Sequence, residues 1–165
     1  MTQNNTLLYD FKNDGQVADW HLVDDVVMGG KSDGQFGFVE EGYGLFSGNV
    51  SLANNGGFSS VRHNLDHRIK ENDSAIMLKV KGDGKNYQFR IRHKRDSYYS
   101  YVYTFSTSGR WETIIIPLNE MYATYRGRRL DFDNFDQKSI EEIGFLIGNK
   151  KEERFRLLLD KIYIR

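Results

Sequence analysis

Several arginines and tyrosines in the second half of the chain have the types and spacing that a ligand-binding surface needs. They alternate with other residues along two neighbouring segments or follow an aromatic pair, so a β-sheet would present many of them on one face. Aromatic rings stack on sugars or bases, and guanidinium groups form paired hydrogen bonds. Tyr–Arg pairs that only cover a solvated sheet are the alternative interpretation. The predicted ligand face consists of Arg90, Arg92, Tyr101, Tyr103, Arg126 and Arg128.

The position of the two tyrosines depends on how their segment pairs with the arginine segment. A hairpin turn centred between Arg95 and Asp96 would set Arg90 opposite Tyr101, so that both lie on the outer face. A register shifted by one residue would bury Tyr101 and Tyr103 instead, because neighbouring residues of a strand point to opposite faces. We expect the exposed Tyr–Arg face.

Two motifs that are typical of phosphate or calcium sites are incomplete. Residues 30–32 read Gly-Lys-Ser, the end of a phosphate-binding loop, but Asp25 stands where that loop requires its first glycine. Residues 131–136 with Glu142 match part of a calcium-binding loop, but Asp136 occupies the position that requires glycine. Tight turns and polar loops explain both segments better.

Other polar clusters do not assemble a metal site or a catalytic group. His63, Asp66 and His67 lie in a polar stretch, where solvated loop residues are the simpler interpretation. Asp24 and Asp25 are adjacent, so on a strand their side chains would point to opposite faces. Cysteine is absent, which excludes thiolate ligands and a cysteine nucleophile. We therefore predict no metal ion, no cofactor and no enzymatic activity.

The composition limits the class of partner. The chain has 165 residues, with 23 Lys and Arg against 23 Asp and Glu, and its formal net charge is zero. This balance provides no overall field that attracts nucleic acid, so we expect no nucleic-acid partner. The length suits one domain over residues 1–165. We see no signal peptide and no apolar run near the ~20 residues of a membrane-spanning helix, so we expect a cytoplasmic protein.

The elements that must position these residues alternate between apolar and polar positions with the period of β-strands. Glycine-containing turns at 82–84 and 108–109 separate some of them, and helix is expected only as single turns within 118–122 and 136–142. About ten strands at this spacing predict an all-β fold, a β-sandwich of two antiparallel sheets with jelly-roll architecture. The clearest expected strands are 74–81, 87–94, 99–106, 111–117, 143–147 and 155–164.

Glycine is concentrated between Trp20 and Ser60, in two motifs that also contain small polar and apolar residues. Glycine at this density in a β-rich chain marks positive φ angles or close backbone contacts. We expect both motifs to form turns or bulges, with Asp25 accepting backbone hydrogen bonds from residues 28–30. The motif residues are Trp20, Asp25, Met28, Gly29, Gly30 and Ser32, followed by Gly48, Asn55, Gly56, Gly57, Phe58 and Ser60.

The order and spacing of these two motifs resemble the complex I intermediate-associated protein family. The resemblance extends from Phe11 to Ile164 and implies a galactose-binding-like β-sandwich. It also implies a role like that of assembly chaperones for respiratory complex I. The N-terminal residues do not resemble a mitochondrial transit peptide, so we expect an untargeted, stand-alone member of bacterial type.

Two functions are consistent with these observations. The first is a non-enzymatic module that assists the assembly or stability of a protein complex through a sheet face, with a protein partner such as a respiratory-complex intermediate. The second is a carbohydrate-binding module that uses the Tyr–Arg face. A tyrosine-lined groove would favour the sugar, and a broad exposed face would favour the protein partner.

Overall fold

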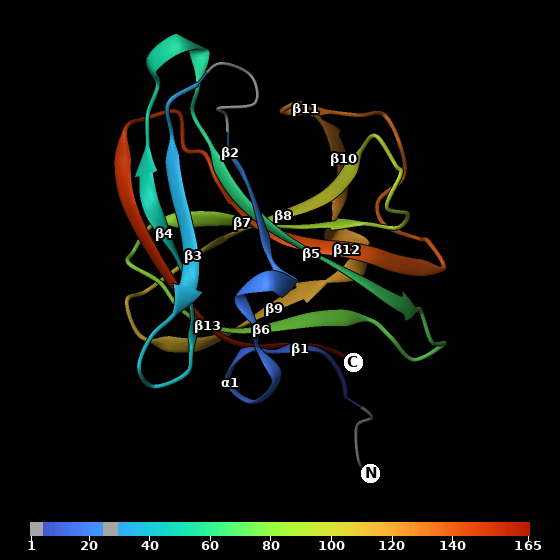
Figure 1. Cartoon of the computed structure of the whole chain (residues 1–165). Coiled ribbons are helices and arrows are strands. Elements are labelled where there is room, and N and C mark those ends of the chain that lie inside the picture. Colours follow the sequence, from blue (N-terminus) through green and yellow to red (C-terminus); the bar gives the residue numbers. More distant parts are fainter. Residues whose placement is uncertain (1–4, 25–29) are drawn as a thin grey trace.

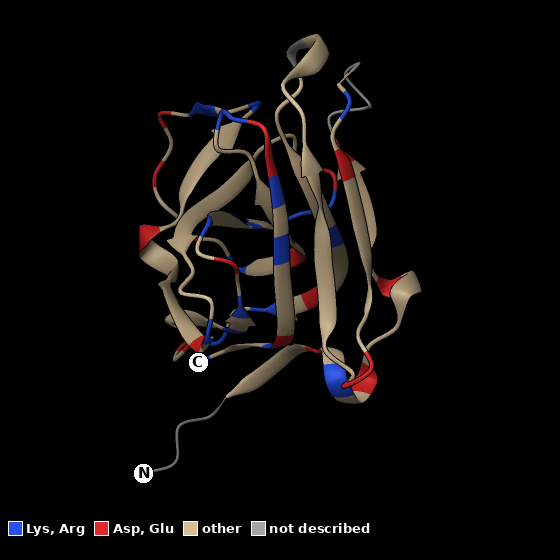
Figure 2. Cartoon of the chain, turned by 90° about the vertical axis from the view of Figure 1, so that its left-hand side faces the viewer, with Lys and Arg blue, Asp and Glu red and all other residues tan. Residues whose placement is uncertain are grey.

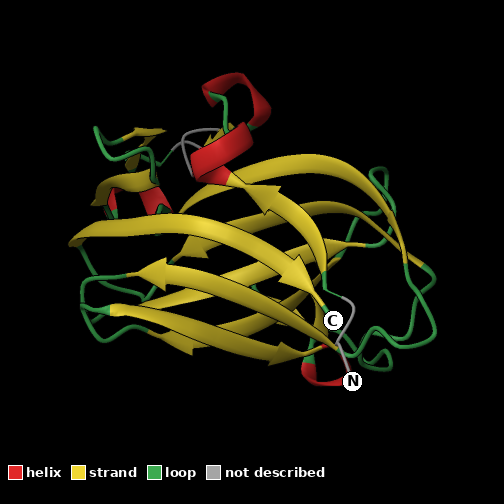
Figure 3. Cartoon of the chain, turned by 90° about the horizontal axis from the view of Figure 1, so that it is seen from below, coloured by secondary structure: helices red, strands yellow, loops and turns green. Residues whose placement is uncertain are grey.

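The structure is a computed structural model of the chain, and it describes residues 5–24 and 30–165. Its strands form two antiparallel sheets that pack against each other as two layers (Figures 1 and 3). The predicted all-β sandwich is therefore confirmed. Helix within the described residues is limited to α1 (Phe11–Asp14) and to the 3-10 turns η1 (Val17–Asp19), η3 (Ala53–Asn55) and η4 (Leu118–Glu120).

Sheet A contains the longest strand of the protein. It consists of β1 (Thr6–Asp10), β3 (Asp33–Phe38), β4 (Gly44–Val50), β6 (Ala75–Lys81), β9 (Trp111–Pro117) and β13 (Glu153–Ile164). The strand order is β3-β4-β13-β6-β9, and β1 also pairs with β13. The strand β13 is therefore central to this layer.

Sheet B contains the candidate site described below. It consists of β2 (His21–Asp24), β5 (Ser59–Arg68), β7 (Asn86–Arg92), β8 (Ser100–Ser106), β10 (Tyr122–Tyr125), β11 (Arg128–Arg129) and β12 (Ser139–Ile147). The strand order is β11-β10-β8-β7-β12-β5-β2. Strands β10 and β11 lie at one edge of this sheet and β2 at the other, with β7 and β12 in the middle (Figure 1).

The core lies between the two sheets, and the alternation of residue types explains it. On β7, Tyr87, Phe89 and Ile91 are buried, whereas the polar residues between them point away from sheet A. The Phe89 ring packs edge-to-face on Phe145 of β12 at 5.4 Å between ring centres. One face of each sheet therefore packs in the core, and the opposite face points away from the other sheet, where it can bind a ligand.

The expected elements mostly match the observed ones. The helical turn predicted within 118–122 is η4. The turn predicted within 136–142 was wrong, because β12 already begins at Ser139, and Asp136 therefore has no helix to cap. The reason is that Ile140 and Ile143 are fully buried and pair with β5 as parts of a strand.

The outer side of sheet A does not concentrate charge of one sign. Figure 2 views the molecule from the side of β3, β4 and β13 and shows basic and acidic positions interspersed along these elements. On β13, for example, Asp160 forms an ion pair of 3.3 Å with Lys79 of β6. This side therefore has the mixed charge of an ordinary protein surface.

Candidate functional site

The outer face of sheet B, which points away from sheet A, carries arginines on two strands that flank a third. Arg62 on β5 and Arg90 on β7 each lie opposite Gly144, which sits between them on β12. A Cβ atom at Gly144 would come within 2.7 Å of the carbonyl oxygen of Val61, so this position disfavours any side chain. The two arginines therefore flank a strand position that places no side chain between them.

The adjacent row of the same face adds a third arginine and one carboxylate. Glu142 lies opposite Arg92, and Arg92 Nε is 3.8 Å from Glu142 Oε1. Arg92 Nε also donates a hydrogen bond of 3.3 Å to Ser100 Oγ. We call Arg62, Arg90 and Arg92 the guanidinium cluster. Within the part of the chain that the structure describes, Glu142 is the one residue that forms an ion pair with this cluster.

Burial and like charge make the free cluster electrostatically unfavourable. Burial, together with the charges of Arg62 and Arg92, lowers the pKa of Arg90 to about 10. Burial also lowers the pKa of Arg62, an effect that Glu142 opposes and Arg92 reinforces. Arg90 Nη1 donates a hydrogen bond of 2.8 Å to Gln88 Oε1, which orients the guanidinium group. Both Arg62 and Arg90 remain charged at neutral pH, so an anionic group would stabilise this surface.

A groove of about 230 Å³ extends from the cluster toward β10 and β11. The Cζ atom of Arg129 lies 4.6 Å from the centre of the Tyr122 ring, a cation–π contact that covers part of this ring. Arg126 and Gly127 form the turn before β11 with left-handed φ angles of 49° and 76°. The groove is lined by Gln88, Arg90, Val102, Tyr122, Thr124, Gly127 and Arg129.

The predicted pairing of the arginine and tyrosine segments was wrong by one residue. Tyr101 lies opposite Ile91 and Tyr103 opposite Phe89, so both tyrosines face the core side of sheet B, and Tyr101 is only 2% exposed. The connection is centred on Asp96 rather than between residues 95 and 96. This register buries Tyr101 against the core, where its ring packs on Phe135 at 5.1 Å.

The predicted ligand face is therefore only partly assembled. Arg90 and Arg92 do share the outer face, where Arg90 lies opposite Val102 instead of a tyrosine. Arg128 pairs with Tyr125 and belongs to the opposite face of the β10–β11 hairpin. Arg126 is exposed in the turn, with its Cζ atom 5.3 Å from the centre of the Tyr125 ring.

Four residues that complete this face were not part of the predicted ligand face. Arg62 and Glu142 were not predicted because their strands are distant in sequence from β7, and only the pairing of β5, β12 and β7 brings them together. Tyr122 and Arg129 join the groove because β10 pairs with β8 at the edge of the sheet. The available signal was the period-two position of Arg62 in a long strand.

The described residues of the first glycine motif have a structural role. Trp20 is 5% exposed, and its ring stacks on Phe11 at 5.1 Å and on His63 at 5.2 Å between ring centres. Ser32 is buried, and its Oγ accepts a hydrogen bond of 2.9 Å from the backbone N–H of Ser51. The predicted positions Asp25, Met28 and Gly29 lie outside the described residues, whereas Gly30 is buried.

The neighbouring Asp24 is a polar anchor that sequence reasoning did not predict. Its carboxylate accepts a hydrogen bond of 2.9 Å from the backbone N–H of Gly34 and one of 2.5 Å from Ser59 Oγ. Gly34 belongs to sheet A, whereas Asp24 and Ser59 belong to sheet B, so this carboxylate links the two layers. Ser60 of the second motif donates a hydrogen bond of 2.5 Å to the carbonyl oxygen of Val23.

The second glycine motif meets two different steric requirements. Gly48 on β4 has a φ of 150°, and an added Cβ would overlap the backbone of Asp33 on β3. Gly57 has a φ of 147°, but an added Cβ would meet only Leu52 Cδ2, at 3.5 Å. Asn55, at the end of η3, precedes the Gly56–Phe58 segment, which lines a hollow of about 310 Å³.

The histidines and acids considered for a metal site have separate partners. His63 Nδ1 lies 2.8 Å from the carbonyl oxygen of Asp19, and His67 Nε2 lies 2.9 Å from Asp73 Oδ2. Asp66 forms an ion pair of 3.1 Å with Arg95. The described residues contain no group of three or more His, Asp or Glu side chains that could hold a metal ion. Over the same residues, no helix has the length and apolar character that crossing a membrane requires.

Comparison with known proteins identifies both a family and a set of similar folds. A family model described as complex I intermediate-associated protein 30 (CIA30) matches residues 9–159. No curated protein matches the chain.

Solved structures with similar folds include carbohydrate-binding modules. The family 11 module from Clostridium thermocellum, solved in complex with a β-1,3-1,4-mixed-linked tetrasaccharide, is 19% identical, with a TM-score of 0.71 over 97% of this chain and 94% of that one. The low-affinity xylan-binding module CBM86 from Roseburia intestinalis is 12% identical, with a TM-score of 0.55 over 99% and 96% of the two chains. These similarities support the two-sheet fold of the chain.

Proposed function

This chain belongs to the complex I intermediate-associated protein 30 family, and on that premise we propose that it is a non-enzymatic binding module that assists the assembly or stability of a protein complex. Its binding surface is the outer face of sheet B, centred on the guanidinium cluster. Its partner is a protein, such as an intermediate in the assembly of a respiratory complex, and it acts in the cytoplasm.

The observation that carries this proposal is the excess of positive charge on one sheet face. Within the described residues, the three arginines of the cluster have one ion-pairing carboxylate, Glu142, and it pairs with Arg92. Holding like charges together in a partly buried site is unfavourable unless a ligand supplies the opposite charge. The carboxylates of Asp and Glu side chains fit guanidinium groups with two parallel hydrogen bonds. An acidic segment of a protein partner therefore matches this face.

Nucleic acid matches the same face less well. Nucleic-acid affinity comes from basic residues that contact successive phosphates along a strand. The guanidinium cluster is compact, and the chain as a whole carries no net charge. A short acidic segment needs only this local charge.

The second candidate function is carbohydrate binding on the same face. The carbohydrate-binding modules with similar folds favour it, as does the groove beside Arg90. Sugar binding by such a face usually relies on exposed aromatic rings. Tyr101 and Tyr103 face the core side, and Arg129 covers part of the Tyr122 ring. The face offers charge more than aromatic surface, which is why we rank the protein partner first.

The test compares partner capture by two double variants that remove equal charge. The variant Arg90→Gln with Arg92→Gln disrupts the guanidinium cluster. The control, Arg154→Gln with Arg156→Gln, removes two exposed arginines with the same spacing from β13 of sheet A. Each purified protein is used as bait in an extract of the native cell, and retained proteins are quantified by mass spectrometry.

We expect proteins that the wild-type chain and the β13 control retain and that the cluster variant loses. Their retention should also fall at about 1 M salt, where the screening length is only ~3 Å. Equal retention by the two variants would contradict the proposed face. Retention that depends on the cluster but is competed by a neutral oligosaccharide would favour the second candidate function.

A further inference from the structure

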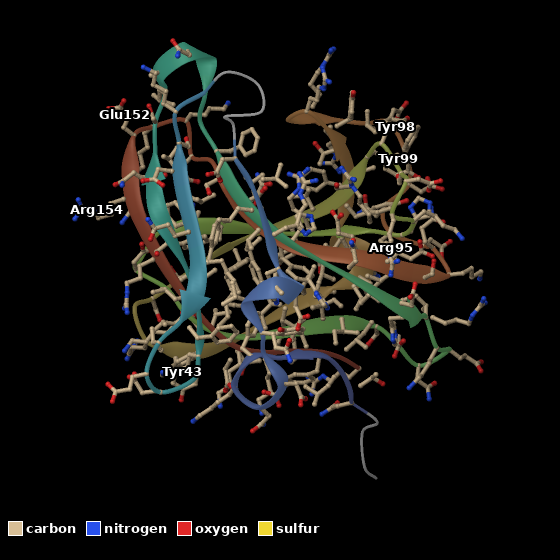
Figure 4. The ribbon with its side chains drawn as sticks, in the orientation of Figure 1. Tyr43, Arg95, Tyr98, Tyr99, Glu152 and Arg154 are labelled. Atoms are coloured by element: carbon tan, nitrogen blue, oxygen red, sulfur yellow. The ribbon has the colours of Figure 1, made fainter. Side chains whose placement is uncertain are left out.

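A second groove lies at the opposite side of sheet B, where β8 begins. Tyr101 faces the core side of the sheet at this end, and the segment that precedes β12 covers it. The groove has a volume of about 340 Å³, within the range of small-ligand sites. Figure 4 shows Tyr98 and Tyr99 projecting together at this end of the sandwich. We call Tyr99, Phe132, Asp133, Asp136 and Gln137 the aromatic groove.

Two aromatic rings at this groove are exposed to solvent. Phe132 is 48% exposed, and the neighbouring Tyr98 is 57% exposed. Tyr99 packs edge-to-face on both of them, at 5.1 Å between ring centres in each case. Rings in direct contact leave no space between them to enclose a cation, but the outer surface of Phe132 remains open to stacking.

The polar side chains of the groove provide acceptors and donors around these rings. Asp133 and Asp136 form no hydrogen bond or ion pair that the structure shows among the described residues, so their carboxylates are free to accept hydrogen bonds. Gln137 Nε2 donates a hydrogen bond of 2.8 Å to the hydroxyl oxygen of Tyr101, which orients its amide. Burial raises the pKa of Tyr99 to about 12, so its hydroxyl stays protonated at neutral pH.

We propose that the aromatic groove is a binding site for a neutral carbohydrate. The exposed Phe132 ring would stack on the apolar face of a sugar ring. Hydroxyl groups both donate and accept hydrogen bonds, and they would pair with the Asp133 and Asp136 carboxylates and the Gln137 amide. This site is independent of the guanidinium cluster, which lies on the outer face of the same sheet.

Other ligand classes fit the aromatic groove less well. The free carboxylates of Asp133 and Asp136 repel an anion. The direct packing of Tyr99 on Phe132 closes the space that an aromatic cage for an ammonium group would need. The volume of about 340 Å³ is that of a site for a small ligand.

Isothermal titration calorimetry with neutral tetrasaccharides tests this proposal. The probes are cellotetraose, xylotetraose and mannotetraose, which differ in the substituents and stereochemistry of the sugar ring. The variants are Phe132→Ala, which removes the exposed ring, and Asp136→Ala, which removes a free acceptor without disturbing the core. Ile115→Ala is the matched control, because Ile115 is 51% exposed on β9 of the other sheet.

We expect at least one tetrasaccharide to bind the wild-type chain and the Ile115→Ala control equally. Phe132→Ala should weaken this binding by about tenfold or more, and Asp136→Ala should weaken it measurably. Arg90→Gln should leave it unchanged, which separates this site from the proposed protein-binding face. The proposal is overturned if no probe binds the wild-type chain, or if Phe132→Ala and Asp136→Ala both bind like the control.

Discussion

Arg62 and Arg90 lie on opposite sides of Gly144 on the outer face of sheet B, although they belong to strands β5 and β7. No side chain separates them, and Arg90 forms no ion pair with a described residue. This arrangement destabilises the free protein locally and prepares the face for an anionic group. Sites that bind ligands often carry such unfavourable arrangements.

Removing the charge of Arg90 should stabilise the free protein. Arg90→Met keeps the aliphatic stem but relieves the repulsion from Arg62 and Arg92. We expect a gain of about 1 kcal/mol, or ~2–4 °C in melting temperature for a chain of this size. The gain should shrink at high salt, where charge repulsion is screened. Differential scanning calorimetry at low and high salt measures the gain in melting temperature and its dependence on salt, with Arg154→Met on sheet A as the control. A lower melting temperature for Arg90→Met at low salt would contradict the prediction.

The same variant has a predictable pH dependence. The pKa of Arg90 is lowered to about 10 in the folded state, below its ordinary value, so the folded state disfavours the charged form. This penalty is fully present below pH ~10 and disappears as the pH rises toward the ordinary value of about 12.5. The stability difference between Arg90→Met and wild type should therefore narrow above pH ~10. Urea unfolding at several pH values measures this stability difference. A difference that stays constant above pH ~10 would contradict the proposed penalty on the charged form of Arg90.

Gly48 should tolerate no larger residue. Gly48→Ala combines a φ of 150° with overlap between the new Cβ and the backbone of Asp33, so we expect a loss of more than about 2 kcal/mol. Gly37→Ala on the adjacent strand is the control, because an added Cβ there meets no atom within 4 Å. Urea unfolding of both variants makes the comparison. Similar stability of the two variants would disprove the steric argument.

A substitution at Gly57 tests the effect of backbone strain without severe steric crowding. Its φ of 147° disfavours a side chain, although the space around an added Cβ is open apart from Leu52. We expect Gly57→Val to lower stability by more than about 1 kcal/mol. The measurement is the melting temperature, which should fall by less than for Gly48→Ala. An unchanged melting temperature would show that this position does not require glycine.

Asp24 should contribute to holding the two sheets together. Asp24→Ala removes the acceptor for the N–H of Gly34 and for the hydroxyl of Ser59, and we expect a loss of about 1–3 kcal/mol. Ser59→Ala removes one of these bonds and should have a smaller effect. A double-mutant cycle measures the coupling between the two side chains. Additive effects would show that the Asp24–Ser59 hydrogen bond does not stabilise the fold.

The sequence by itself determined the class of fold and the core-facing side of several strands. Alternation along residues 87–92 and 111–117 requires strands, because a period of two places apolar side chains on one face. The same pattern identified Arg90 and Arg92 as outward-facing residues of one strand. The glycine motifs identified the family, since each combines glycines with an aromatic residue at a fixed spacing. This residue is Trp20 in the first motif and Phe58 in the second.

Only the tertiary structure decided which residues form the two candidate sites. Alternation does not specify the centre of a connecting loop. The observed register differs from the predicted one by one residue, so Tyr101 lies on the core side instead of the outer face. The guanidinium cluster depends on pairing between β5, β12 and β7, which no local pattern encodes. Arg62 therefore becomes a neighbour of Arg90 only across Gly144, because strands that are distant in sequence pair when their apolar faces are buried together.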